Sequence, residues 1–352
     1  MYLGVLRSSM ASIKLVAIAK DEAAYLPEWI YHHLSIGIQE IDVYLNGITD
    51  NSYRLMRLIN AKHKNVKFYN ADHLVGISIR SKRSFQQVVY RFAWSTEKYR
   101  KNVSHLAFLD IDEYLISSSF GSKINTMFNS AGKFDILSNV WYTDLPSEIE
   151  PFARFFCESQ MVQKMSIIKS IGRLKSNVGH PMVHNFKGVQ RKPDKINARM
   201  SNGCPIKYSG LGKRLSQDDA DRSIDSIEPW FVFHRVYRSH DEYCASLMRG
   251  RKHRSNDAPI KDNRNGYIAM EDNKRVIGSP MQYSINPKIC RDYQKGFNCF
   301  ISDCDLAGEI EKGRNFVRNK YKELEKLLTD NPELLNQYNN VFRGTVFSNH
   351  LS

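Results

Sequence analysis

The stretch IKLVAIAKDEAAYLPEWIYHHLSIGIQEIDVYL, residues 13–45, decides the fold. Residues 13–19 are apolar except for Lys14 and include β-branched side chains, which is typical of a short strand buried on both faces. From Leu26 the apolar residues recur at helical spacing, and Pro27 suits a first helical turn. Gly37 ends this helix, and residues 41–45 predict a second strand. The stretch is therefore a strand, helix, strand unit.

The same alternation continues beyond residue 45. The patterns predict a helix over residues 53–61, a strand over 66–69, a helix from Phe85 and a fourth strand over 105–109, with a basic, flexible stretch at 76–83. Alternating strands and helices at these spacings favour a largely parallel sheet with helices on both faces. Ligands bind such sheets at the carboxyl ends of the strands. Two acidic clusters fall there, after residues 19 and 109.

The alternation weakens after residue 121. We expect strands over 134–140 and 229–236, mixed short strands in the basic segment to about 215, a charged helix over 239–249 and a long C-terminal helix ending before Asn331. The expected domains are an N-terminal extension, 1–12, a ligand-binding domain, 13–250, and a mostly helical extension, 251–352. The fold class is α/β, with a mostly parallel sheet, a mixed region after it and a C-terminal helical part.

Charge is concentrated in one part of the chain. The 352 residues are 42% hydrophobic and carry a net charge of +14, and residues 160–215 hold twelve Lys or Arg against a single acid, Asp194. This excess indicates an anionic partner such as nucleic acid, a nucleotide, a phosphorylated sugar or a lipid headgroup. No uninterrupted apolar run is long enough to span a membrane, and no signal peptide is evident. We expect a cytoplasmic protein.

The sharpest motif is FLDIDEYL, residues 108–115. Asp110 and Asp112 stand two apart at the end of a buried strand, so in extended geometry they point to the same side. Two neighbouring carboxylates suit a hard divalent cation, Mn²⁺ or Mg²⁺, which would neutralise a diphosphate. The alternative is a solvated acidic turn that caps a helix.

Other candidate residues lie far away in the sequence. His234, at the end of an apolar run, is either an imidazole ligand to the same cation or a hydrogen-bonded strand-end histidine. Lys20, Asp21, Glu22 and Asp50 follow the first two strands, where a carboxylate either contacts a base or ribose or caps a helix. Basic residues of 160–215, Lys169 among them, and the run from Arg249 to Arg254 suit phosphate oxygens, or form a solvated surface.

Three motifs in order resemble the nucleotide-sugar domain of GT-A glycosyltransferases, close to the family 2 and family 92 type. The first is a strand ending in K-N-E, then L-x-E-W-I, a histidine and a glycine, with Asp21 standing where the family usually has Asn. The second is FLDIDEYL. The third is H-Y-x-x-K-S-x-E-E-F-x-x-K-x-x-R-G, which corresponds to residues 234–250. Here Ser239, Glu242, Arg249 and Gly250 match, and Arg235 and Ser246 depart from the pattern.

The resemblance implies a GT-A-like (Rossmann-like) fold and transfer of a sugar from a nucleotide-sugar, most often a UDP-sugar, to a hydroxyl of a glycan or lipid-linked glycan. Asp110 and Asp112 would bind the metal and the ribose and diphosphate, with His234 as a further ligand. Lys20, Asp21, Glu22, Asp50 and Arg249 would line the nucleotide site. An inverting reaction needs a carboxylate base. The candidates are Asp144, Glu148 and Glu150.

Two other classes remain as alternatives. A phosphatase of the haloacid dehalogenase type also uses two aspartates at a strand end, but it wants Thr or Val where this chain has Tyr114. A non-catalytic nucleic-acid or anionic-surface binding protein would use the basic segment, with salt-dependent affinity. The carboxylates at the strand ends favour the enzyme. In that case the positive charge faces the acceptor or the inner face of an anionic membrane rather than nucleic acid.

Overall fold

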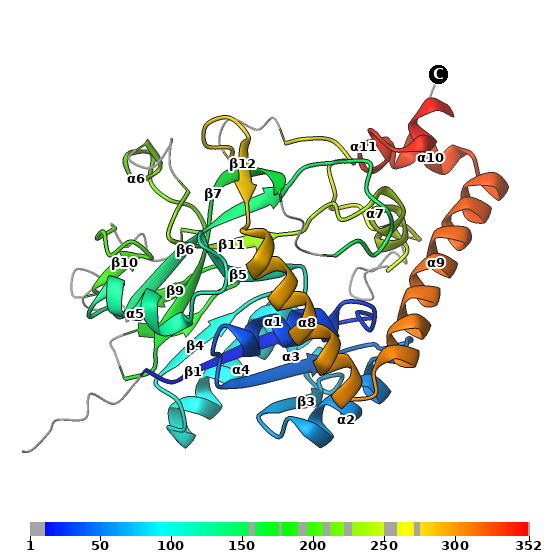
Figure 1. The fold of residues 1–352 in the computed structure, drawn as a ribbon. Coiled ribbons are helices and arrows are strands. Elements are labelled where there is room, and N and C mark those ends of the chain that lie inside the picture. Colours follow the sequence, from blue (N-terminus) through cyan, green and yellow to red (C-terminus); the bar gives the residue numbers. More distant parts are fainter. Residues whose placement is uncertain are drawn as a thin grey trace, which may run out of the picture.

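The computed structural model describes most of the chain in one α/β arrangement (Figure 1). The described residues are 11–154, 159–175, 178–188, 196–206, 212–221, 227–249, 259–270 and 275–350. Most of the expected N-terminal extension and the domain boundary expected at residue 250 lie outside this part.

The first half of the sheet is parallel, as the sequence predicts. Its strands lie in the order β3-β2-β1-β4, and each neighbouring pair is parallel. The four carboxyl ends therefore lie at one edge. The elements are β1 (Ile13–Ala19), α1 (Leu26–Ser35), β2 (Glu40–Leu45), α2 (Ser52–Lys62), β3 (Val66–Asn70), α3 (Leu74–Ser81), α4 (Phe85–Arg100) and β4 (His105–Phe108).

The second half of the sheet is mixed. The order continues β4-β7-β6-β11-β5, and β7 runs antiparallel to both of its neighbours. The short strand β10 pairs with β6, β12 pairs with β7, and β8 with β9 forms a separate ribbon. The elements are β5 (Glu113–Ser117), α5 (Ile124–Ala131), β6 (Ile136–Asp144), β7 (Ser159–Arg173), β8 (Val178–Pro181), β9 (Phe186–Gly188), β10 (Ala198–Met200), α6 (Gln217–Asp221), β11 (Trp230–His234), α7 (His240–Leu247) and β12 (Met281–Ser284).

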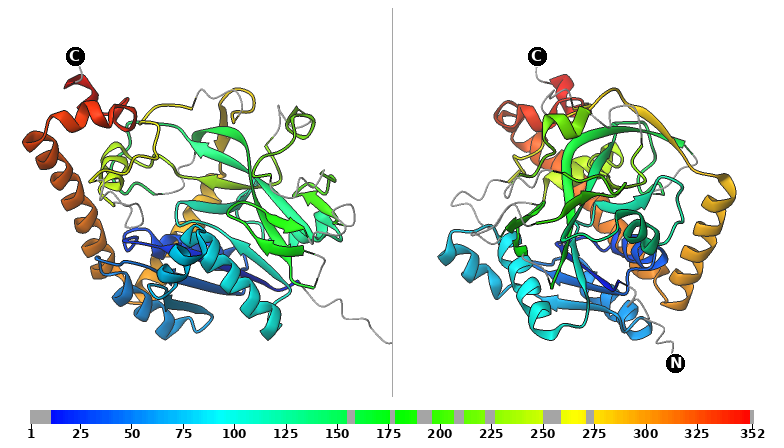
Figure 2. Two further views of the ribbon diagram at one scale, coloured as in Figure 1. Left: turned by 180° about the vertical axis from the view of Figure 1, so that it is seen from behind. Right: turned by 90° about the vertical axis from the view of Figure 1, so that its left-hand side faces the viewer.

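The helices bury apolar residues against both faces of the sheet. Alternate residues of β1 face opposite ways, so Leu15 joins the core under α1 and α2 while Val16 joins the core under α4. The C-terminal helices cover the α1 face and continue upward past α7 (Figures 1 and 2). They are α8 (Pro287–Asp303), α9 (Ala307–Asp330), α10 (Glu333–Gln337), α11 (Asn339–Phe342) and a 3₁₀ turn (Val346–His350). In the described part, no helix has the length and apolar character needed to cross a bilayer.

The α/β class, the helices on both sheet faces and the helical C-terminal region are thus confirmed, while one local prediction is wrong. The stretch 76–83, predicted to be flexible, is mostly the helix α3, because Leu74 and Ser78 are buried beneath it. The short strands predicted in the basic segment are present as β8, β9 and β10, and the 15-residue strand β7 precedes them. The segment beyond residue 250 also adds β12 to the sheet before its helices begin.

Two glycines of α9 provide a matched test of how this helix packs on the rest of the molecule. A Cβ at Gly313 would lie 2.6 Å from the backbone nitrogen of Ala24, whereas a Cβ at Gly308 would meet nothing within 4 Å. We expect Gly313→Ala to lower the free energy of unfolding by about 1–3 kcal/mol through overpacking. Gly308→Ala should be neutral or stabilise by up to about 1 kcal/mol. Urea unfolding of both variants checks this, and equal effects would contradict the packing described.

Candidate functional site

Two carboxylates fix the loops after β1 and β2 to each other. The Asp21 Oδ1 atom accepts hydrogen bonds from the backbone N–H groups of Thr49, at 2.6 Å, and Asp50, at 3.1 Å. In return, Asp50 accepts from the backbone N–H groups of Ala23, at 2.8 Å, and Ser52, at 2.9 Å. Both side chains therefore hold backbone at the edge where the parallel strands end. Their predicted contact with a nucleotide stays a prediction.

Glu22 joins the tip of β1 to the segment after β11. Its carboxylate pairs with the guanidinium of Arg249 and lies 3.6 Å from Nη2 of Arg238. The Lys20 Nζ atom donates to the backbone carbonyl of Arg249 at 2.8 Å. Arg238 also lies over the ring of Tyr25, 3.5 Å from its centroid. Lys20, Glu22 and Arg249, predicted separately to bind the nucleotide, thus form one charged cluster.

The acidic turn between β4 and β5 is held from below by a buried tryptophan. The Trp29 Nε1 atom donates to the backbone carbonyls of Asp110, at 3.1 Å, and Glu113, at 2.8 Å. The Glu113 carboxylate accepts from the Asp110 backbone N–H at 3.0 Å and pairs with Lys169 at 2.9 Å. Since Trp29 is completely buried and comes from α1, the core sets the position of this turn.

Asp110 points toward α4. Its Oδ1 atom accepts hydrogen bonds from Gln86 Nε2, at 2.8 Å, and the Tyr90 hydroxyl, at 3.2 Å, and its other oxygen lies 3.6 Å from Lys169 Nζ. The side chain is 38% exposed, so one side of the carboxylate stays open to solvent. Asp110 is therefore oriented by protein groups and still accessible to a ligand.

Asp112 lies close to His234, which the sequence predicts to belong to the same site. Antiparallel pairing of β11 with β5 sets His234 opposite Glu113, and the Asp112 Oδ2 atom lies 3.5 Å from His234 Nε2 and 3.7 Å from Arg264 Nη2. Burial alone would raise the pKa of Asp112, but the nearby His234, Arg264 and Arg238 outweigh it and hold that pKa well below its usual range. Asp112 is thus an anion in a positively charged setting.

The side chains of Asp110, Asp112 and His234 are of the kinds that bind a hard divalent cation, but only two of them lie close together. Two carboxylates and an imidazole suit Mn²⁺ or Mg²⁺, and the buried Nδ1 atom of His234 has no hydrogen-bond partner. Within the described residues, no three His, Cys, Asp or Glu side chains come close enough to hold a metal. Asp112 and His234 supply two adjacent donors, while Asp110 is bonded to Gln86 and Tyr90 through one of its oxygens.

The three candidate bases differ in surroundings. The Asp144 carboxylate, at the end of β6, accepts from the backbone N–H groups of Tyr237, at 3.1 Å, and Arg238, at 2.9 Å, so it holds the loop that follows β11. Burial raises the pKa of Asp144. Glu148 and Glu150 are exposed in the loop after β6. The structure records no contact of these three carboxylates with Asp110 or Asp112, and their catalytic role stays a prediction.

Sequence reasoning missed several groups at this site. Gln86 and Tyr90 orient Asp110, and Arg264 approaches Asp112 from the segment beyond residue 250. The helical register of α4 carries a signal for the first two, because Gln86 and Tyr90 are one turn apart on the helix that precedes β4. Arg264 lies in an irregular segment, where no periodic pattern points to it.

In the described residues of the basic segment, some cations are buried and others are exposed. Lys164 and Lys169 are buried in β7 and pair with Glu228 and Glu113. Arg173 pairs with Asp135 at 2.7 Å. Burial would lower the pKa of Lys169, but Asp110 and Glu113 raise it overall. Lys164 and Lys169 therefore neutralise carboxylates inside the protein, whereas Arg173 is 45% exposed. Arg191, Lys192 and residues 250–254 lie outside the described part.

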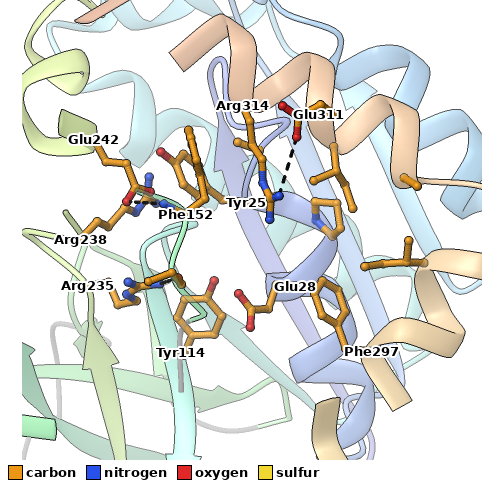
Figure 3. A pocket seen from close by; sticks show the side chains of 16 residues that line it. Tyr25, Glu28, Tyr114, Phe152, Arg235, Arg238, Glu242, Phe297, Glu311 and Arg314 are labelled. Carbon is orange, nitrogen blue, oxygen red and sulfur yellow. Dashed lines mark hydrogen bonds and ion pairs between the residues drawn. The ribbon is translucent and has the colours of Figure 1, made fainter. Parts of the chain in front are cut away.

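A cavity of about 220 Å³ lies between this site and the C-terminal helices, which form part of its wall (Figure 3). Arg238, which contacts Glu22, forms part of its wall together with Tyr25 and Glu242. Figure 3 shows Glu28 and Tyr114 on its floor and Arg314 of α9 on the far side. The cavity thus lies between α1, the strand ends and the helices α8 and α9.

Comparison with known proteins finds similarity among solved structures. No protein family model matches this chain, and no curated protein sequence matches it. The galactosyltransferase LgtC, solved in complex with donor and acceptor sugar analogues, aligns at 20% identity over 36% of this chain and 46% of that chain, with a TM-score of 0.23. An active-site mutant of LgtC aligns with the same values. The chain thus covers less than half of the LgtC chain.

Proposed function

We propose that this protein transfers a sugar from a nucleotide-sugar, in particular a UDP-sugar, to a hydroxyl of a glycan or lipid-linked glycan acceptor, with Mn²⁺ or Mg²⁺ as cofactor. The observation that carries the proposal is the approach of His234 to Asp112, at 3.5 Å. The two residues are far apart in the sequence. They belong to two separate motifs, and the resemblance of both motifs to one family assigns them to the same site. If the protein were a phosphatase, neither His234 nor the motif over residues 234–250 would have an assigned role in the site.

The charges around the site suit a nucleoside diphosphate. Glu22 and Asp50 lie at the ends of β1 and β2, where a nucleoside would bind, and Arg238, Arg249 and Arg264 bring positive charge from later segments. A divalent cation held by Asp112 and His234, with Asp110, would supply a Lewis acid that stabilises the departing diphosphate. The protein's part is to hold the donor between the strand ends and these guanidinium groups.

The reaction needs one proton acceptor. In the inverting reaction that we propose, a carboxylate takes the proton from the acceptor hydroxyl, the oxygen attacks C1 of the sugar, and the C1–O bond to the diphosphate breaks, with the electron pair leaving on the diphosphate. We assign this role to Asp144, because its carboxylate is held in place by the backbone N–H groups of Tyr237 and Arg238, and burial raises its pKa, which favours proton acceptance.

A donor panel tests this function. The protein is incubated with UDP- and GDP-sugars and Mn²⁺, and released nucleoside diphosphate is measured with and without mixed glycan and glycolipid acceptors. We expect release from a UDP-sugar that stops when the metal is chelated. Release of inorganic phosphate from simple phosphate esters, with no release of nucleoside diphosphate from any donor, would contradict the proposal and favour the phosphatase alternative.

The tryptophan beneath the acidic turn gives a sharper test, because a matched control exists. Trp29→Phe removes the donor to the Asp110 and Glu113 carbonyls, whereas Trp94→Phe removes a buried indole whose Nε1 has no hydrogen-bond partner. We expect Trp29→Phe to weaken Mn²⁺-dependent UDP binding about tenfold, from an imprecisely held turn. Trp94→Phe should change this affinity less than about twofold. Calorimetry measures both, and equal losses of affinity would remove the positioning role of Trp29.

A further inference from the structure

The exposed apolar side chains of this protein gather on one pair of helices. Among the described residues, four of the six large hydrophobic side chains that are exposed lie on α3 and α4, namely Ile77 at 42%, Ile79 at 64%, Phe92 at 48% and Tyr99 at 88%. The other two, Met161 and Val346, lie on separate elements. Scattered exposed apolar residues need no explanation, but a gathering of this kind marks an interaction surface.

The same helices carry a strong positive charge. Residues 77–101 contain seven Lys or Arg and a single acid, Glu97, so their net charge is +6. Glu97 is buried and bonded to Lys14 at 2.6 Å, so it does not offset this charge at the surface. The exposed cations are Arg80, Lys82, Arg83, Lys98, Arg100 and Lys101.

The two helices that carry these groups are neighbours in the fold. Lys82, with a φ of 51°, ends α3 in the left-handed region, and the Ser84 side chain caps the start of α4 directly after it. The two helices pack against each other, and Phe92 and Tyr99 are seven residues apart, on one face of α4. The right-hand view of Figure 2 shows the light-blue α3 at the outside of the molecule. We name the exposed side chains of residues 77–101 the α3–α4 surface.

We propose that the α3–α4 surface binds an anionic lipid bilayer. Exposed Ile, Phe and Tyr side chains can insert at the depth of the headgroups, while neighbouring Lys and Arg side chains contact lipid phosphates. A nucleic acid would use the charge but has no use for exposed Ile77 and Ile79. The basic segment 160–215, from which the sequence predicted such a contact, has its lysines of β7 buried in internal ion pairs.

The position of this surface relates it to the candidate site. Gln86 and Tyr90, on the same helix α4, bond to Asp110. The helix that carries part of this surface therefore also contacts the acidic turn, which suits an acceptor anchored in that bilayer. This last step rests on the proposed function, whereas bilayer binding itself does not.

Vesicle sedimentation of the full chain tests the inference. We expect binding to vesicles of about one third phosphatidylglycerol in phosphatidylcholine and none to pure phosphatidylcholine vesicles. The double variant Ile77→Ser, Ile79→Ser should lower the partition coefficient at least about tenfold. The double variant Arg80→Gln, Arg83→Gln should lower it about fivefold per cation removed.

Matched variants elsewhere serve as controls. Met161→Ser with Val346→Ser removes equally exposed apolar side chains, and Lys322→Gln with Lys326→Gln removes exposed cations of α9. Both controls should bind the anionic vesicles as wild type does. Absence of binding to anionic vesicles at low salt would overturn the proposal, as would equal binding by Ile77→Ser, Ile79→Ser. If the Ile77→Ser, Ile79→Ser variant binds both heparin and anionic vesicles as the wild type does, the surface is a general polyanion site instead. UDP binding, measured in parallel, tests the proposed function separately.

Discussion

Replacing Asp112 by Asn is expected to lower Mn²⁺-dependent release of UDP from the donor by about a hundredfold or more. Asp112 is the carboxylate nearest His234 and also lies 3.7 Å from Arg264. Asn keeps the shape of the side chain but removes its charge, so the proposed metal would lose a ligand while His234 and Arg264 remain. The rate of UDP release at saturating donor measures the effect.

The control for this variant is Asp330→Asn, because Asp330 is an exposed carboxylate at the end of α9. It should leave the rate of UDP release unchanged. Circular dichroism should show that both variants fold. If Asp112→Asn retains wild-type metal-dependent release, Asp112 does not bind the metal and the site assigned here is wrong.

Replacing Lys14 by Met is expected to lower the free energy of unfolding by about 3–5 kcal/mol. Lys14, on β1, is 1% exposed, and its Nζ atom lies 2.9 Å from Glu40, 3.2 Å from Asp42 and 2.6 Å from Glu97. Without the ammonium group, Asp42 and Glu97 remain buried beside each other with no neutralising charge. Urea unfolding at neutral pH measures this loss, and Lys64→Met, an exposed lysine, is the control.

The pH dependence of this variant gives an independent check. Burial already raises the pKa of Asp42, although Lys14 opposes that rise. Without Lys14 the pKa in the folded state rises further above its value in the unfolded chain. A carboxyl shifted in this direction is most compatible with the fold at acid pH, and its cost grows as the pH rises above its unfolded value of 3.8. The penalty for Lys14→Met should therefore be smaller near the acid end, and a penalty that is independent of pH would contradict the ion-pair account.

Much of the parallel half of the fold is predictable because its signals are local. The apolar run of β1, Pro27 at the start of α1 and Gly37 after it each mark an element boundary within a few residues. Topology then follows from general rules, since parallel strands joined by helices put their carboxyl ends at one edge. Asp21, Asp50 and Asp110 lie at that edge for this reason.

The errors arise where the decisive contact is distant in the sequence. Lys164 and Lys169 appear solvent-exposed in a basic segment, but the acids that neutralise them, Glu228 and Glu113, come from other parts of the chain. The stretch that forms α3 contains Gly76 and several basic residues, which are typical of loops, so its sequence predicts a flexible segment. Its order comes from packing against α4, which a local pattern does not contain.

The candidate site shows the same division. Asp112 and His234 could be assigned together because they stand in two sequence motifs that resemble those of one family. The hydrogen bonds from Trp29 to the acidic turn and the approach of Arg264 to Asp112 could not, because each joins segments more than 80 residues apart, with no pattern that links them. Long-range contacts of this kind set the electrostatics of the site, so its details required the structure.

The most direct measurement of the central claim is a calorimetric titration of the wild-type protein with UDP and with GDP, in Mn²⁺ and after removal of the metal. Binding of a nucleotide-sugar at the ends of β1, β2 and β4 predicts that UDP binds in Mn²⁺ and that its affinity falls steeply when the metal is chelated. If neither nucleotide binds in Mn²⁺, or if UDP binds equally well without metal, the proposed metal-dependent nucleotide-sugar site is contradicted.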